Sequence, residues 1–205
     1  MDVFKDFAID SEVYSLMSIN IAKNTEFALI MADIDGMLGI NENFGYDAGD
    51  AALSLIAKNI TDILPNSGKY RARDHFIILL PNKSKEDAFL VAEELRTRIC
   101  SEELDYVSAE GSKLRVSVSI GVASYPEDGN HHADIYRRAD SAMMRAKKAG
   151  RNRVMLAREE KLMPKTSHYT ANQLEKLSLI SHKTGVGEAA LLREALDDLM
   201  RKYDN

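Results

Sequence analysis

The sequence predicts an α/β domain with a mixed central sheet, followed by a small helical module. Patterns typical of strands and of helices alternate as far as about residue 157, which favours one α/β sandwich. A β-hairpin pattern within that series makes the sheet mixed rather than wholly parallel. The regular pattern lapses near Pro164, and two amphipathic helical patterns follow. We therefore expect two domains, over residues 1–160 and 161–205.

Four stretches of the first domain have the pattern of strands. Residues 26–35 form a nearly continuous apolar run that ends in two aspartates, which is typical of a central strand covered on both faces. Residues 68–81 read as a hairpin, and residues 114–126 alternate apolar with small side chains. Residues 152–157 supply a last strand. The end of the central strand is expected to open onto a functional site.

Three helices are expected between these strands. The first covers residues 47–64, where apolar residues recur at helical spacing. Ser84 is expected to cap the second, over residues 85–100. The third runs over residues 133–149 and stops at Gly150, a residue that suits the end of a helix.

The composition is that of a soluble globular protein. The chain has 205 residues, of which 45% are hydrophobic and 29% are charged. No apolar run approaches the roughly 20 residues that span a bilayer, and the N-terminus is acidic where a signal peptide would be basic. The single cysteine, Cys100, cannot form an internal disulfide. These features predict a cytoplasmic protein with no membrane partner.

The net charge of −5 is unevenly distributed along the chain. Residues 161–205 carry seven Lys and Arg against six Asp and Glu, while the preceding residues carry twenty against twenty-six. Neither part has the basic excess of a nonspecific nucleic-acid binder. Any contact with DNA must therefore come from a few placed groups.

The residues at the end of the central strand suggest a nucleotide site. Asp33 and Asp35 lie two apart on a strand and so point to the same side, and their carboxylate oxygens suit Mg²⁺. Asn41 and Asp50 follow in the turn and first coil of the next helix. An Asp and Asn pair suits guanine, whose N1–H and N2–H donors can both bond to one carboxylate. Taken singly, these residues are better explained as helix caps and solvent-exposed side chains.

The combination of motifs resembles the GGDEF domains of diguanylate cyclases. The segment DIDGMLGINENFGYDAGDAAL (33–53) is similar to the DxDxFKxxNDxxGHxxGDxxL motif of that family. VSVSIGVASYP (116–126) and ADSAMMRAKKAGRNRV (139–154) resemble its later strand and helix motifs, in the same order and spacing. The resemblance extends from about residue 26 to 157. It implies the palm-like α/β (α+β) fold that this family shares with nucleotide polymerases.

The motif that names the family is altered. Residues 72–76, Ala-Arg-Asp-His-Phe, stand in the place of Gly-Gly-Asp-Glu-Phe. In the family, the glycines let the backbone approach the phosphates of GTP, and the glutamate helps to hold the catalytic metals. Arg73 puts a long cation where a bare turn is needed, and His75 replaces a hard anionic ligand with an imidazole that Mg²⁺ seldom takes. The resemblance therefore implies a degenerate domain in which cyclase chemistry is lost.

Other residues of the family motifs are retained. The resemblance implies that Asn41 and Asp50 read guanine, that Lys147 and Arg151 grip the distal phosphates, and that Asp33 and the carbonyl of Ile34, together with Asp74, hold a metal ion. Arg73 either pairs with phosphate or fills the pocket. The RxxD inhibitory site for cyclic di-GMP has no counterpart at residues 63–66.

The second domain resembles the ribbon-helix-helix family of DNA-binding proteins. The pattern covers about forty residues and is carried by LEKLSLISHKTGVGEAALLREAL (174–196), after the extended stretch KTSHYT (165–170). Such proteins are intertwined dimers whose paired strands enter the major groove. The resemblance implies that Tyr169 and Ser167 face the dimer core. It also implies five residues in contact with DNA: Lys165, Thr166, His168, Thr170 and Gly187.

These observations favour a homodimeric transcription regulator that senses a guanine nucleotide, either GTP or cyclic di-GMP, without catalysis and binds DNA through its tail. Mg²⁺ is expected only together with the bound nucleotide. Two alternatives stay open: an enzyme with residual cyclase or nucleotide hydrolase activity, and a dimerising scaffold that binds neither ligand nor DNA.

Overall fold

The computed structural model describes residues 4, 7–9, 11–72, 75–109, 111–158 and 165–203. The chain divides into two compact units, Met1–Arg158 and Glu159–Asn205. This division falls two residues before the boundary that the sequence pattern indicates. None of the helices that the structure describes is long and apolar enough to cross a membrane.

A six-stranded sheet forms the centre of the first unit, with the strand order β1-β3-β4-β2-β7-β8. The outer pairs β1–β3 and β7–β8 are parallel, and the inner pairs are antiparallel. The prediction of a mixed sheet is therefore confirmed. The strands are β1 (Ala8–Ile9), β2 (Phe27–Ile34), β3 (Gly68–Ala72), β4 (His75–Pro81), β7 (Val118–Tyr125) and β8 (Val154–Leu156).

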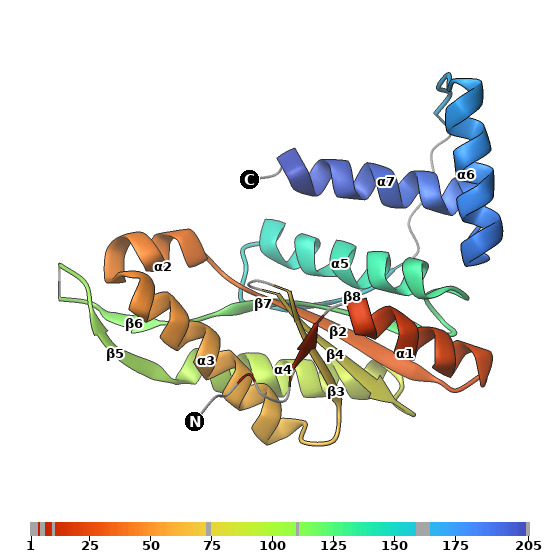
Figure 1. Ribbon diagram of the computed structural model, residues 1–205. Helices are drawn as coiled ribbons and strands as arrows, with labels where there is room; N and C mark the ends of the chain where they lie inside the picture. The colour runs from red at the N-terminus through yellow and green to blue at the C-terminus, as the bar shows by residue number, and fades with distance from the viewer. Residues whose placement is uncertain are drawn as a thin grey trace. The chain divides into compact units, whose positions relative to one another are not determined.

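Helices cover both faces of this sheet, as Figure 1 shows. α1 (Ser11–Ala22) and α5 (His132–Lys148) lie on one face, and α3 (Tyr46–Ile63) and α4 (Lys85–Ser101) lie on the other. Successive side chains of β2 point alternately to the two faces, so Ile30 packs with α3 and α4 while Leu29 packs with α1 and α5. Every residue of β2 is buried. The continuous apolar run of this strand is explained by its cover on both sides.

The three helices expected in the first unit are present. α3 begins and ends one residue before the predicted bounds, and α5 likewise. The hydroxyl of Ser84 accepts a hydrogen bond from the backbone N–H of Asp87 (3.1 Å), which confirms the predicted cap of α4. Helical spacing and a polar cap were therefore sufficient to place these elements.

The small residues of β7 allow α5 to approach the sheet closely. A side chain at Gly121 would overlap the carbonyl oxygen of Ala139 and the backbone nitrogen of Met143, both of which belong to α5. Because these are backbone atoms of a helix, they cannot move aside individually. The contact fixes α5 on the sheet and, with it, the last turn that carries Lys147.

One part of the predicted site lies on an unexpected element. Residues Met37–Phe44 form a separate helix, α2, and Gly45, with φ 89°, stands between it and α3. The expectation that Asn41 lies in a turn was therefore wrong, because Asn41 belongs to α2. Glycine suits the break, since other residues rarely adopt a positive φ.

The strand predicted over residues 114–126 is interrupted. Its first residues belong to β6 (Lys113–Arg115), which pairs with β5 (Glu103–Val107) in a separate two-stranded sheet. The central strand β7 begins only at Val118. Val116 lies between the two strands and is buried, so the alternation of apolar residues continues across the break and conceals it.

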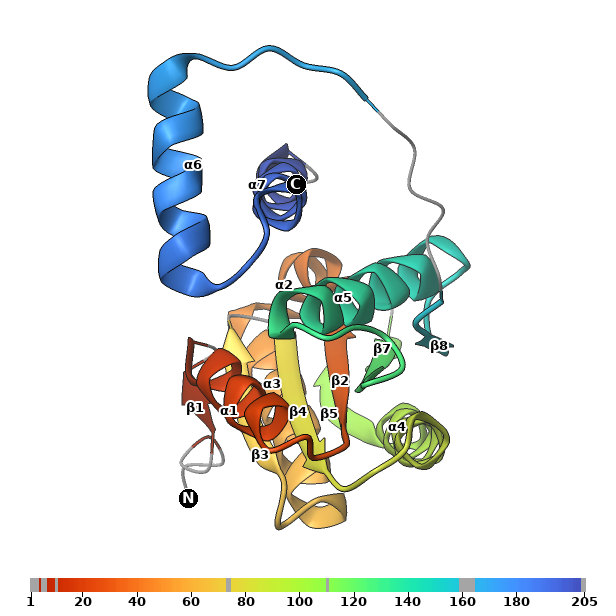
Figure 2. The same ribbon diagram turned by 90° about the vertical axis from the view of Figure 1, so that its right-hand side faces the viewer.

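The second unit contains two helices, α6 (Ala171–Thr184) and α7 (Glu188–Tyr203), which follow an extended segment (Figure 2). Thr170 and Gln173 form a reciprocal capping box at the start of α6. Gly185, with φ 71°, ends α6 in the left-handed conformation. Residues 165–170 are exposed and form no strand within the described part of this unit.

Candidate functional site

Asp33 lies at the end of β2 and is the centre of the candidate site. Its side chain is 1% exposed. The strand register places His75 of β4 opposite Asp33 on one side and Ser119 of β7 opposite it on the other. Residues that face each other in this way point to the same side of the sheet, which is here the side covered by α5.

Two side chains approach the two oxygens of the Asp33 carboxylate. The Nε2 atom of His75 lies 2.8 Å from Oδ2, and the Nζ atom of Lys147 lies 2.6 Å from Oδ1. The distances are those of ion pairs, but neither oxygen receives a hydrogen bond of good geometry in the described structure. Lys147 comes from the last turn of α5. A buried carboxylate is thus partly compensated by groups from two other elements.

Asp35 has a different environment from Asp33. Its Oδ2 accepts hydrogen bonds from the hydroxyl of Ser117 (2.8 Å) and from the backbone N–H of Asn152 (3.0 Å). Its Oδ1 accepts one from the hydroxyl of Ser119 (2.6 Å). These donors join the end of β2 to β7 and to the turn after α5. In this structure the oxygens of Asp35 are therefore hydrogen-bonded, whereas those of Asp33 are not.

The described residues do not fit a magnesium site. Among them, no group of three or more His, Cys, Asp or Glu side chains is placed to hold a metal ion. Of the two carboxylates that the structure describes here, Asp33 and Asp35, only Asp33 has oxygens without a hydrogen bond, and a lysine and a histidine lie beside it. Ile34 is buried at the end of β2. Arg73 and Asp74, predicted to contact phosphate and metal, lie outside the described residues.

The two residues expected to read guanine come from consecutive helices. Asn41 of α2 is half-buried, and its Oδ1 atom is buried without a hydrogen-bond partner in the described structure. A side chain at Gly49 of α3 would overlap this oxygen, so the glycine makes room for the amide. Asp50, the next residue, is exposed. The site therefore offers one unused acceptor and one exposed carboxylate.

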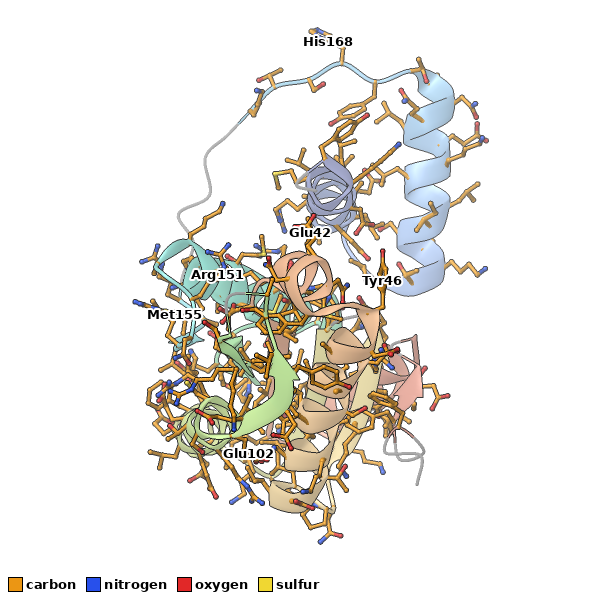
Figure 3. The ribbon with its side chains drawn as sticks, turned by 90° about the vertical axis from the view of Figure 1, so that its left-hand side faces the viewer. Glu42, Tyr46, Glu102, Arg151, Met155 and His168 are labelled. Atoms are coloured by element: carbon orange, nitrogen blue, oxygen red, sulfur yellow. The ribbon has the colours of Figure 1, made fainter. Side chains whose placement is uncertain are left out.

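The two cations expected to grip phosphate flank the end of α5. Lys147 is in its last turn, and Arg151 follows Gly150 in the turn that leads to β8. Arg151 has φ 60° and is exposed (Figure 3). Its backbone N–H donates to the carbonyl of Ala146 (3.0 Å). The guanidinium of Arg151 forms no ion pair with any residue that the structure describes.

The candidate DNA-binding residues of the second unit begin in its extended segment. Lys165, Thr166 and His168 are exposed there, and Figure 3 shows His168 pointing away from the helices. Thr170 has a structural role as well, because its Oγ1 accepts from the backbone N–H of Gln173 (3.3 Å). Gly187 precedes α7, and its carbonyl accepts from Leu191 (3.1 Å).

Comparison with known proteins settles the family. A sequence model described as the GGDEF domain of diguanylate cyclases matches residues 7–153. The chain belongs to the GGDEF family. A second model, for a ribbon-helix-helix domain, matches residues 162–204. This GGDEF chain thus has the two-part organisation that its motifs indicate.

Named relatives and solved structures resemble the GGDEF part of the chain. Diguanylate cyclase A of Treponema denticola is 36% identical over 149 residues, which are 71% of this chain and 39% of that protein. A diguanylate cyclase of Vibrio cholerae is 35% identical over 63% of this chain and 40% of its own length. The chain therefore spans less than half the length of these relatives.

Solved structures of GGDEF domains resemble the same part of the chain. The active GGEEF domain of a Vibrio cholerae diguanylate cyclase has a TM-score of 0.64 and 30% identity, and the match covers 73% of this chain and 94% of that one. The GGDEF domain of DgcB from Caulobacter crescentus, in complex with c-di-GMP, has a TM-score of 0.63 and 26% identity, covering 72% and 87%.

Two contacts in this GGDEF site were not predicted from the sequence. The direct approach of His75 to Asp33 was not predicted, although pairing the predicted strands in register would have placed these residues opposite each other. The role of Asn152 as a partner of Asp35 was also missed. That contact joins segments far apart in sequence, and no local pattern indicates it.

Proposed function

We propose that the GGDEF domain of this chain binds a guanine nucleotide, GTP or cyclic di-GMP, without converting it, and that the tail binds DNA as a homodimer. The chain would then be a nucleotide-sensing transcription regulator. The observation that carries the non-catalytic part is the arrangement around Asp33, whose two oxygens face Lys147 and His75.

This arrangement opposes metal-dependent phosphoryl chemistry. A metal pair needs several hard oxygen ligands, and Mg²⁺ seldom takes imidazole. Asp33 supplies one carboxylate, but Lys147 already lies at its Oδ1 and balances its charge. His75, at Oδ2, supplies no negative charge. Among the described residues, a cation entering here would therefore meet the ammonium of Lys147 and the single carboxylate of Asp33, where a metal pair needs several anionic ligands.

The same domain keeps groups that suit binding. The buried Oδ1 of Asn41 has no partner in the described structure, and an unsatisfied buried acceptor costs about 1–3 kcal/mol. A guanine N–H would relieve that cost. The ammonium of Lys147 has three donors, so it can bond to Asp33 and to a phosphate oxygen together. Arg151 offers a planar fork of donors for a second phosphate. These groups support a ligand that combines guanine with phosphate.

The tail supports DNA binding by a dimer. An apolar stripe lies exposed on the last turns of α7 and comprises Leu196, Leu199, Met200 and Tyr203. A two-helix unit of this size cannot bury such a stripe by itself. A second copy would cover it, and pairing would also supply the missing partner for the extended residues 165–170. Regulation further requires that the nucleotide bind the DNA-competent and the DNA-incompetent states of the chain with different affinities.

A nucleotide-processing enzyme is the second candidate. One observation favours it: neither oxygen of Asp33 receives a well-formed hydrogen bond, so a rearrangement of Lys147 and His75 would expose a buried carboxylate to a cation. The relatives named diguanylate cyclases agree with this reading. In that case Asp33 would be essential for turnover.

Ligand binding is tested by the melting temperature of the purified chain with GTP, in EDTA and in Mg²⁺. At a hundredfold excess over Kd, a ligand adds about 2.7 kcal/mol, so we expect a rise of about 5 °C or more. The rise should persist in EDTA, because Lys147 and His75 already compensate Asp33. Asn41→Ala should reduce the rise by about half or more, because one amide acceptor is worth about 1–3 kcal/mol. Asn43→Ala is the matched control, because Asn43 lies on the same helix and its amide donates to the carbonyl of Gly39 (2.8 Å). An unchanged melting temperature with both GTP and cyclic di-GMP would rule out the sensing function.

A further inference from the structure

We propose that Asn152 is a positioning residue for phosphate binding, which acts by holding Arg151 in a fixed orientation beside Lys147. The inference rests on the proposed nucleotide-binding function and assigns part of it to the turn between α5 and β8. Asn152 itself does not need to touch the ligand.

The turn has an unusual backbone. Arg151 has φ 60° and Asn152 has φ 43°, so two consecutive residues other than glycine are left-handed. This conformation is unfavourable for an ordinary L-residue, and asparagine tolerates it better than arginine does. Such strain persists only where the surrounding structure determines it, and it gathers at functional sites. The cause of the strain is therefore to be sought in the contacts of the turn.

Those contacts are made by Asn152. Its backbone N–H donates to Oδ2 of Asp35 (3.0 Å), whose carboxylate is in turn fixed by Ser117 and Ser119. Its side-chain Oδ1 accepts from Nη1 of Arg96 (3.0 Å). Its Nδ2 lies 3.4 Å from the sulfur of Cys100, to which it donates. The turn is thus tied to the sheet by its backbone and to α4 by its side chain.

The partner on α4 is itself held in place. The Nε and Nη2 atoms of Arg96 donate to one carboxylate oxygen of Glu93 (3.1 and 2.8 Å). This leaves Nη1 directed at Asn152. The anchor is therefore a rigid one, and the amide of Asn152 receives a charge-assisted hydrogen bond.

The result is an oriented cation. The backbone of Arg151 is fixed on both sides, by its own N–H bond to Ala146 (3.0 Å) and by the clamp on Asn152. Its side chain remains exposed, one turn beyond Lys147. Holding a backbone in the orientation required for binding removes part of the cost of ordering a long side chain. The clamp should therefore strengthen phosphate binding about three- to tenfold, which corresponds to about 0.7–1.4 kcal/mol.

The experiment compares the Kd values of GTP and GMP, measured by isothermal titration calorimetry on the full chain. Asn152→Gly keeps the left-handed backbone and the N–H bond to Asp35 but removes the bonds to Arg96 and Cys100. We expect it to weaken GTP about three- to tenfold and to leave GMP within twofold. Asn152→Asp keeps an acceptor for Arg96 and should retain most of the GTP affinity.

A double variant separates positioning from general stability. If Asn152 acts through Arg151, then Asn152→Gly should have no further effect on GTP binding in an Arg151→Ala background. Equal losses for GTP and GMP, or a loss that persists without Arg151, would overturn this inference and leave the proposed function standing. Absence of GTP binding by the unmodified chain would overturn both. Circular dichroism of each variant identifies any that fail to fold. If Asn152→Gly fails to fold, the Kd values of Asn152→Asp are compared with those of the unmodified chain instead.

Discussion

At the scale of single residues, the site is defined by what stands beside Asp33. The register of β2 and β4 puts His75 directly across from it, and α5 brings Lys147 to its other oxygen. The side chain at this one strand position therefore decides whether a second carboxylate or an imidazole faces Asp33. With the imidazole of His75 and the ammonium of Lys147 beside it, the carboxylate of Asp33 is more suited to ion pairing than to coordinating a hard metal ion.

Gly49 provides a test of the guanine-reading groups. In Gly49→Ala the new methyl would overlap Oδ1 of Asn41 and push the amide aside. We expect the affinity for GTP to fall at least tenfold, because Oδ1 of Asn41 would no longer lie where it can accept a hydrogen bond from guanine. Stability should change by less than about 1 kcal/mol, since a side-chain amide can rotate away. Titration calorimetry and urea unfolding measure the two quantities. Retained affinity would show that Asn41 does not contact the base.

The residue types of the site could be predicted from sequence, but their contacts could not. The motifs gave Asp33, Asn41 and Lys147 as members of one site. No local pattern reveals that Lys147 reaches Asp33, because the contact depends on how closely α5 packs on β7. Likewise, the sequence pattern places Asp33 and Asp35 equivalently on one strand, whereas in the structure β2 ends at Ile34 and Asp35 accepts hydrogen bonds that Asp33 lacks.

At the scale of elements, local patterns were reliable where one pattern corresponds to one element. α3, α4 and β2 were predicted because helical spacing and a continuous apolar run are unambiguous. The helix α1 and the strands β1 and β5 were not predicted. The break between α2 and α3 was missed too, since a single positive-φ glycine, Gly45, makes it. Short pairings depend on tertiary partners more than on local sequence.

The packing of α5 on β7 gives a prediction for stability. In Gly121→Ala the added methyl would overlap backbone atoms of Ala139 and Met143, so we expect a loss of about 3 kcal/mol or more in the free energy of unfolding. Gly39→Ala is the matched control. Its methyl would have one neighbour, Nδ2 of Asn43, at 3.9 Å, and alanine favours helix by about 0.5–1 kcal/mol. Equal stability of the two variants in urea unfolding would refute the close-packing argument.

At the scale of the whole molecule, the chain joins a GGDEF domain with a well-buried core to a small helical module whose apolar side chains are largely exposed. No residue of α6 is buried, and α7 leaves Leu196 and Leu199 about half exposed. The first unit, by contrast, has buried clusters on both faces of its sheet. The sequence predicts this asymmetry, because forty residues with two apolar stripes cannot enclose a core.

Leu199→Glu tests the proposed dimer. Leu199 is 50% exposed on the apolar stripe of α7, and a charge there would be buried at the contact between two copies. We expect the variant to sediment as a monomer and to lose salt-sensitive retention on DNA, with GTP binding unchanged. Leu90→Glu is the control, because Leu90 is an exposed leucine on α4 of the first unit. A dimer that survives Leu199→Glu but dissociates in Leu90→Glu would place the interface in the GGDEF domain.

The central claim, that this GGDEF domain binds a guanine nucleotide without converting it, is tested most directly by incubating the full chain with GTP and Mg²⁺ and analysing the nucleotides by chromatography. We predict that GTP remains intact at protein concentrations that bind it, for as long as an active diguanylate cyclase takes to exhaust it. Formation of a cyclic dinucleotide that disappears in Asp33→Ala would contradict the claim, because it would show that Lys147 and His75 give way to catalytic metal.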